Sequence, residues 1–187
     1  MRIKNLLLLT ILFSISSFSW SQFTMMKVEG LKQGKFKSES TKAGSTDKTE
    51  VLAYAMEIKS PRDVASGQAT GKRQHIPLTI WKIAGSSSPQ FFQALVNNET
   101  LKTVTIEFYK PDDVFTSSKT EQLSYKIELT NAYVTSYRQV MGSAAMEGFK
   151  SIPALIYDEI KFVYEKITVT SVNGNASASD DWNSTNR

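Results

Sequence analysis

The residues of this chain that are best suited to chemistry gather in one stretch, residues 66–82, which reads SGQATGKRQHIPLTIWK. It contains His75, the only histidine among the 187 residues, just after a loop rich in glycine and basic side chains. Two kinds of chemistry match these residue types: phosphate binding by a glycine-lysine loop, and acid-base catalysis or metal binding by histidine. Each of them requires a particular spacing of residues.

Phosphate binding fails on that spacing. A P-loop has four residues between its glycines and a Ser or Thr after its lysine. Here three residues separate Gly67 from Gly71, and Arg73 follows Lys72. The run after the loop alternates as a strand does, so no helix N-terminus would face a phosphate group.

Catalysis or metal binding by His75 finds no partners in the sequence. Without cysteine or a second histidine, a metal site would need carboxylates for every other ligand, and none lies within ten residues of His75. The chain also lacks the GxSxG elbow of a serine nucleophile. The sequence therefore predicts no catalytic residue, no metal site and no cofactor. We expect His75 to be hydrogen-bonded at the start of a strand, or exposed in a contact loop.

The elements that would position this stretch are mainly strands, because apolar residues recur at every second position over most of the chain. Strands are expected over residues 23–29, 50–60, 76–83, 102–110, 123–137 and 157–172. We expect the fifth of these to bend near Asn131, and the sixth to shift its apolar phase by one residue near Lys166.

One helix is expected between the third and the fourth of these strands. Ser88 is placed as its N-cap and Pro89 at its first position. Phe91, Phe92, Leu95 and Val96 would form an apolar stripe that packs on the sheets. The result is a mainly β fold, a sandwich or barrel with one helix.

Composition bounds the remaining possibilities. The length suits one domain, and 41% hydrophobic with 21% charged residues is typical of a folded protein. Residues 1–21 resemble a signal peptide, with two cations followed by an apolar run and small residues at the cleavage site. A domain over residues 22–174 and a polar tail over 175–187 would follow.

Charge argues against two classes of partner. The whole chain has a formal net charge of +4, but removal of Arg2 and Lys4 with the leader leaves 20 basic and 18 acidic residues. This balance is too near neutral to argue for nucleic acid or an anionic membrane surface as a partner, so we expect neither for the mature chain.

Several segments, taken in order, resemble one family. They are MKVEGLKQGKFKSES (26–40), SPRDVASGQATGKRQHIPLTIWK (60–82), SSPQFFQALVNNETLKTVTIEFYK (87–110) and SASDDW (177–182). Together they are similar to the haemolysin-coregulated protein (Hcp) family, the tube protein of type VI secretion systems. The likeness extends over roughly residues 25–182.

This resemblance implies a two-sheet β-barrel-like fold with one flanking helix, and homohexameric rings that stack into a hollow tube able to carry effectors. Sheath, spike and effector proteins of a contractile secretion system are its implied partners. The family's long loop, which reaches a neighbouring subunit, corresponds to residues 38–49, with Lys42 and Thr46 as candidate contacts. The other candidate subunit or ring contacts are Gly67, Gly71, Lys72, Arg73 and His75.

The leader leaves the location open, because tube proteins of this family assemble in the cytoplasm and normally lack one. A genuine signal peptide would export the chain to the periplasm or the outside. Translation from Met25 or Met26 would instead give cytoplasmic assembly followed by secretion. A stand-alone exported Hcp-like binding module or effector is the alternative function.

Overall fold

The computed structural model describes residues 23–40, 45–110, 122–141 and 155–182. The expected signal peptide and the candidate contact Lys42 lie outside these residues. Within them the chain is mainly β with one helix, as expected. The elements are β1 (Phe23–Gly30), β2 (Gly34–Lys35), β3 (Thr49–Val51), β4 (Ala53–Lys59), β5 (Gln74–Ile83), α2 (Ser88–Val96), β6 (Leu101–Lys110), β7 (Gln122–Met141), β8 (Ile156–Ser171) and β9 (Ala176–Asp181).

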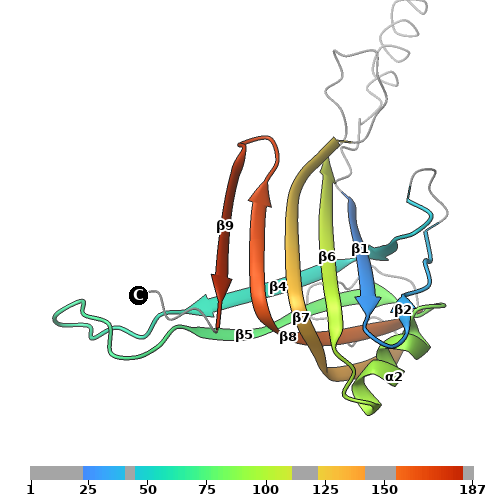
Figure 1. The fold of residues 1–187 in the computed structure, drawn as a ribbon, viewed down its shortest axis with the longest axis horizontal. Coiled ribbons are helices and arrows are strands. Elements are labelled where there is room, and N and C mark those ends of the chain that lie inside the picture. Colours follow the sequence, from blue (N-terminus) through green and yellow to red (C-terminus); the bar gives the residue numbers. More distant parts are fainter. Residues whose placement is uncertain (1–22, 41–44, 111–121, 142–154, 183–187) are drawn as a thin grey trace, which may run out of the picture.

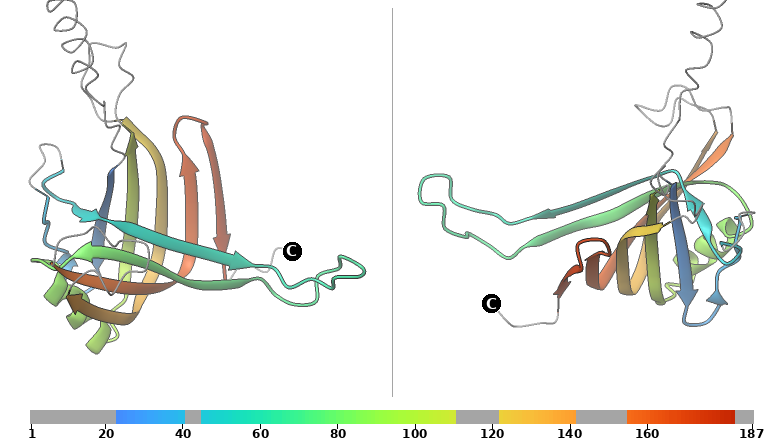
Figure 2. Two further views of the ribbon diagram at one scale, coloured as in Figure 1. Left: turned by 180° about the vertical axis from the view of Figure 1, so that it is seen from behind. Right: turned by 90° about the horizontal axis from the view of Figure 1, so that it is seen from above.

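The strands form one antiparallel hydrogen-bonded series, β2-β1-β6-β7-β8-β5-β4, in which β3 also pairs with β1 and β9 with β8. The series folds over into two layers whose strands cross at a steep angle (Figures 1 and 2). Its two ends are not hydrogen-bonded to each other, but residues 49–59 connect them, because β3 pairs with β1 and β4 pairs with β5. This confirms the two-sheet, barrel-like architecture.

The long strands β7 and β8 belong to both layers. The first half of β7 pairs with β6, and its second half pairs with β8 alone. Asn131 has a φ of 48° midway along β7, and the register of β7 against β8 shifts between Val134 and Ser136. The expected bend near Asn131 is therefore present. A left-handed residue is a suitable pivot because it turns the strand without ending it.

Strand β8 pairs with β7 along one edge, and along its other edge the partner strand changes from β5 to β9. Leu78–Ile83 of β5 pair with the first part of β8, whereas β9 pairs with it from Lys166 onward. Tyr164 and Ile167 are both buried, which confirms the shift of the apolar phase on this strand. Residues 163–165 are the place where β5 and β9 separate along one edge of β8.

The core fills the space between the crossed layers. Its fully buried members include Leu78, Ile80, Val104, Ile106, Ile127, Leu129, Ile160 and Phe162. Helix α2 closes one end through Phe91 and Ala94. The expected stripe was wrong for Phe92 and Val96, which are 54% and 58% exposed. The helix lies on the core with a narrow face, so residues about 100° away from that face point outward.

Two expected boundaries differ in detail. Ser87 rather than Ser88 is the N-cap, so the helix already includes Ser88. The polar tail expected from residue 175 contains β9, whose six residues pair with Lys166–Ser171. Backbone hydrogen bonding to an open strand edge does not depend on apolar side chains, which is why a polar composition hid this strand.

Candidate assembly surface

The outer part of the β4–β5 hairpin, residues 57–76, is a projection that we call the arm. Strand β5 pairs with β8 only from Leu78 onward, so before that point β4 and β5 pair with each other alone. The arm consequently projects well beyond the two layers (Figures 1 and 2). Apolar side chains remain exposed along it, at Ile58, Val64 and Ile76.

Hydrogen bonds within a turn fix the conformation at the end of the arm. The Asp63 carboxylate accepts hydrogen bonds from the backbone N–H of Ala65 (3.1 Å) and Ser66 (2.7 Å). Gly67 has a φ of 69°, a conformation that glycine adopts without strain. An isolated bridge between Arg62 and Ala69 closes the loop. An exposed loop therefore has a defined shape.

His75 lies at the base of the arm, at the start of β5, and is not free. Its side chain is only 4% exposed. Nε2 lies 2.8 Å from a carboxylate oxygen of Asp180 in β9, and Nδ1 lies 2.9 Å from the Tyr164 hydroxyl in β8. Because a carboxylate only accepts, Nε2–H of His75 donates to Asp180. This is the hydrogen-bonded histidine at a strand entrance that the sequence suggested.

Arg73 joins the same cluster. Its guanidinium forms an ion pair with the Asp180 carboxylate and donates a hydrogen bond to the Asp181 carbonyl oxygen (3.0 Å). The Trp182 ring lies against the His75 ring, with 4.8 Å between centroids. We call these residues, Arg73, His75, Tyr164, Asp180 and Trp182, the arm-base cluster.

Two pKa shifts describe the charge state of the cluster. Burial opposes ionisation of Asp180, but the hydrogen bonds from Arg73 and His75 outweigh it and lower the pKa of this carboxyl. Burial, together with the nearby Asp180 charge, raises the pKa of Tyr164 to about 12. At neutral pH the carboxylate is therefore ionised and the phenol remains a hydrogen-bond donor.

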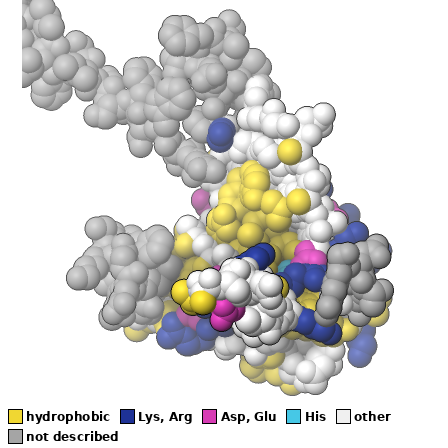
Figure 3. All heavy atoms as spheres, turned by 90° about the vertical axis from the view of Figure 1, so that its left-hand side faces the viewer, with side chains coloured by type: hydrophobic (Ala, Val, Ile, Leu, Met, Phe, Trp, Pro, Cys, Tyr) yellow, Lys and Arg dark blue, Asp and Glu magenta, His cyan; other side chains and the backbone are white. Residues whose placement is uncertain are grey.

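A groove of about 530 Å³ lies beside the cluster, where β5 and β9 separate. Its walls are mostly apolar and include Ile76, Tyr133, Val163 and Trp182. Figure 3 shows hydrophobic side chains gathered on the face that carries the arm, with the histidine and its charged neighbours at the edge of this area.

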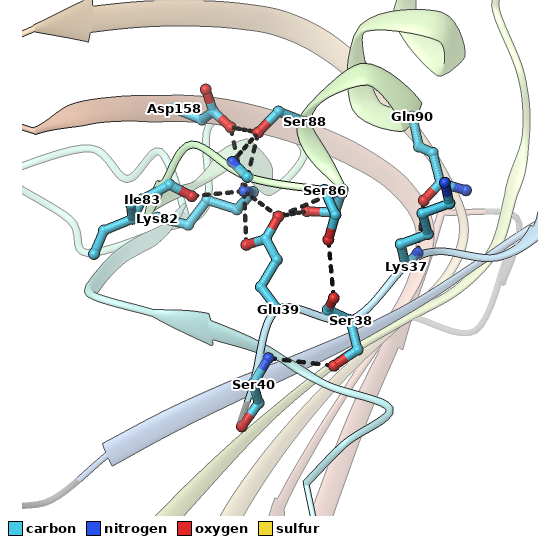
Figure 4. A network of polar contacts seen from close by, with 12 residues as sticks. Lys37, Ser38, Glu39, Ser40, Lys82, Ile83, Ser86, Ser88, Gln90 and Asp158 are labelled. Atoms are coloured by element: carbon cyan, nitrogen blue, oxygen red, sulfur yellow. Dashed lines mark hydrogen bonds and ion pairs between the residues drawn. The ribbon is translucent and has the colours of Figure 1, made fainter. Parts of the chain in front are cut away.

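The second candidate surface is the loop expected to reach a neighbouring subunit, residues 38–49. Its first part is fixed by Glu39, which reaches toward Lys82 and the start of helix α2 (Figure 4). The Lys82 ammonium lies 3.0 Å from both Glu39 oxygens and 3.3 Å from Asp158. Ser87 donates to Glu39 through its backbone N–H and its hydroxyl, both at 2.7 Å.

The other end of this loop is fixed to the first layer. Lys48 pairs with Glu107 (2.9 Å) and donates to the Tyr109 hydroxyl (2.6 Å), and Lys27 pairs with Asp47 (3.0 Å). Both ends of the loop are thus held by residues of the same chain, while Thr46 stays exposed between them. The turn at residues 46–47 lies on the opposite side of the molecule from the tip of the arm (Figure 1).

The structure sorts the candidate contacts into two groups. Arg73 and His75 meet in the arm-base cluster, whereas Gly67, Gly71 and Lys72 are exposed farther out on the arm. Sequence reasoning missed Asp180 and Tyr164 as partners of His75, because they lie 105 and 89 residues away along the chain. Trp182 gave the one available signal, since a large aromatic in a polar segment needs a contact.

Chemical alternatives can be compared with the same residues. The described part of the chain brings no group of three or more His, Asp or Glu side chains together that could hold a metal ion. In that part, too, no helix combines the length and the apolar character that crossing a membrane requires.

Comparison with known proteins decides the family. The model of the family described as type VI secretion system effector, Hcp, matches residues 25–170. This chain belongs to the Hcp family. A curated relative from Pseudomonas aeruginosa, named major exported protein, is 31% identical over 168 residues, which cover 85% of this chain and 94% of the relative.

Solved Hcp structures share the fold over nearly their whole length. One described as Hcp protein has a TM-score of 0.73 at 23% identity and covers 87% of this chain and 99% of its own. Hcp1 from enteroaggregative E. coli has a TM-score of 0.72 at 26% identity, covering 86% and 98%. The resemblance seen in the sequence is confirmed.

Proposed function

We propose that this Hcp chain is the structural tube subunit of a type VI secretion system. Six copies close into a ring, rings stack into a hollow tube, and the tube carries effectors. The observation that carries the proposal, for a member of this family, is the arm. It projects from the layers with an ordered tip and exposed apolar side chains, which gain little burial within the monomer.

The physics of ring closure suits this chain. A heterologous contact repeats from copy to copy and closes when its rotation divides a full turn. Open strand edges such as the outer edge of β4 gain partners in the same step. Neither a disulfide nor a metal ion is needed, in keeping with a chain that has no cysteine.

We assign the intersubunit contacts to two surfaces. Gly67, Gly71 and Lys72 would contact a neighbour through the outer arm, and Thr46 through the turn on the far side. Lys42, which lies outside the described residues, stays a candidate contact of the same loop. Arg73 and His75 would act from within the subunit, because their side chains are already engaged by β8 and β9. The two surfaces lie on opposite sides of the subunit, as a head-to-tail contact requires.

Light scattering and negative-stain electron microscopy of the purified protein test the proposal. The expected result is the mass of six copies and images of rings. Lys72→Glu and Val64→Asp should each raise the protein concentration needed for half-assembly tenfold or more. The circular dichroism spectrum of both variants should match that of the parent. Ser179→Ala, on the exposed face of β9, is the matched control and should assemble normally.

A protein that stays monomeric at the highest concentrations tested would contradict the tube and favour a stand-alone binding module. Sheath, spike and effector proteins are the partners we propose for the assembled tube, and co-purification with them tests that part separately.

The route of export is a further part of the proposal. The relative from Pseudomonas aeruginosa carries the name major exported protein. We propose that this chain is exported as well. N-terminal sequencing of the protein from its native host decides the route: Gln22 as the first residue would show that residues 1–21 are a cleaved leader and would favour the stand-alone exported module, whereas a start at Met25 or Met26 would show cytoplasmic assembly followed by secretion, as the tube requires.

A further inference from the structure

We propose that the C-terminal strand β9 and Trp182 lock the direction of the arm, so that Asp180 and Trp182 are positioning residues for assembly. The part that concerns assembly rests on the proposed function. The lock itself is a property of the single subunit and can be tested without rings.

The arm needs support at its base. A two-stranded ribbon on its own is marginally stable in water, and its direction is set where it joins a larger sheet. The layers stop supporting the arm before Leu78, where pairing of β5 with β8 begins. A contact just beyond that point acts close to the pivot of a long projection, so a small displacement there moves the tip a long way.

The arm-base cluster is placed at this pivot. His75 is three residues outside Leu78 and Arg73 is five, and both bind the same Asp180 carboxylate. Asp180 stands in β9, which is hydrogen-bonded along Lys166–Ser171 of β8. The Asp180 carboxylate therefore connects two arm residues, Arg73 and His75, to β9 and through it to β8.

Trp182 completes the lock from the other side. Its backbone N–H donates to the Glu165 carbonyl oxygen (3.0 Å), which fixes the residue just beyond β9 on β8. Its ring then packs on the ring of His75. The His75 side chain is enclosed between β8, β9 and this indole, although it belongs to an exposed hairpin.

The expected consequence for assembly is entropic. An arm that already points in one direction loses little freedom when it meets a neighbour, whereas a free arm must be ordered during binding. Loss of the lock should leave the fold intact and raise the concentration needed for half-assembly about tenfold.

Distance measurement between spin labels tests the lock directly. The chain has no cysteine, so Val64→Cys at the tip and Lys102→Cys on β6 supply two unique labelling sites. The labelled parent should show a narrow distance distribution when diluted into unlabelled protein. Asp180→Asn and Trp182→Ala should each broaden this distance distribution. Arg73→Gln should broaden it as well, because it removes the arm residue that pairs with Asp180. Ser179→Ala should leave it unchanged.

Assembly and folding are then measured for each variant. Circular dichroism and thermal unfolding identify any variant that fails to fold. Arg73→Gln tests the same contact without substituting a residue of β9. An unchanged distance distribution in folded Asp180→Asn and Arg73→Gln overturns the lock. A broadened distribution with normal assembly overturns its role in assembly. A narrow distribution in the labelled parent together with no rings from the unlabelled protein would instead contradict the tube and leave the lock standing.

Discussion

Among single residues, Lys82 is a buried cation held by two carboxylates, those of Glu39 and Asp158. It follows Leu78 and Ile80 on the inward side of β5, and both Lys82 and Asp158 are 0% exposed. A buried charge is tolerated only with its counter-charges in place. Lys82→Met leaves Asp158 and Glu39 without a cation, so the free energy of unfolding should fall by about 3–5 kcal/mol in urea denaturation.

Lys59→Met is the matched control for Lys82. Lys59 also pairs with a carboxylate, that of Glu57, but both side chains are more than half exposed. The unfolding free energy should change by less than about 0.5 kcal/mol. Equal effects of the two substitutions would show that burial of the Lys82 network contributes nothing.

Asp180 predicts a dependence on pH. Its folded pKa is lowered, so the folded state holds its proton less tightly than the unfolded chain does. The stabilisation is fully present above the ordinary pKa of 3.8 and is lost as the pH falls through the lower folded value. In urea denaturation Asp180→Asn should be clearly less stable than the parent at pH 7, and the gap should narrow toward pH 3. A gap that widens in acid would contradict this assignment.

Among the secondary-structure elements, β7 connects the layers by its bend. Asn131 has a φ of 48°, and its amide donates to Glu165 on β8 (2.6 Å). A β-branched residue is strained in that conformation. Asn131→Val should lower the free energy of unfolding by about 1–3 kcal/mol. Asn131→Gly also removes the side-chain hydrogen bond but keeps the backbone relaxed, so it should cost less in the same denaturation experiment. The reverse order would count against the bend as the cause.

For the molecule as a whole, assembly should appear as extra stability. Binding of a folded subunit to other folded subunits stabilises the native state by mass action. The apparent Tm should therefore rise over a hundredfold increase in protein concentration, as followed by calorimetry. Val64→Asp should lose most of this rise while keeping the Tm of the dilute parent. A Tm independent of concentration in both proteins would contradict self-assembly.

Local patterns in the sequence were sufficient for the strands and for the absence of a familiar catalytic motif. Alternation predicted the apolar face of β6 and the shift of the apolar phase in β8, since both depend on residues within a few positions of one another. The family resemblance added the fold and the ring. Patterns of this kind failed for Phe92 and Val96, because the width of the buried helix face depends on the layers beneath it.

By itself, the sequence determined that His75 has no neighbour along the chain able to make it a catalyst, and that its loop opens a strand. Only the tertiary structure brought Asp180, Tyr164 and Trp182 to this histidine, and only it enclosed Lys82 between Glu39 and Asp158. Alternation and spacing describe neighbours in the chain. Tyr164 and Asp180, which are 89 and 105 residues from His75, reach it because β8 runs through both layers, and that path is decided by the packing of the whole core.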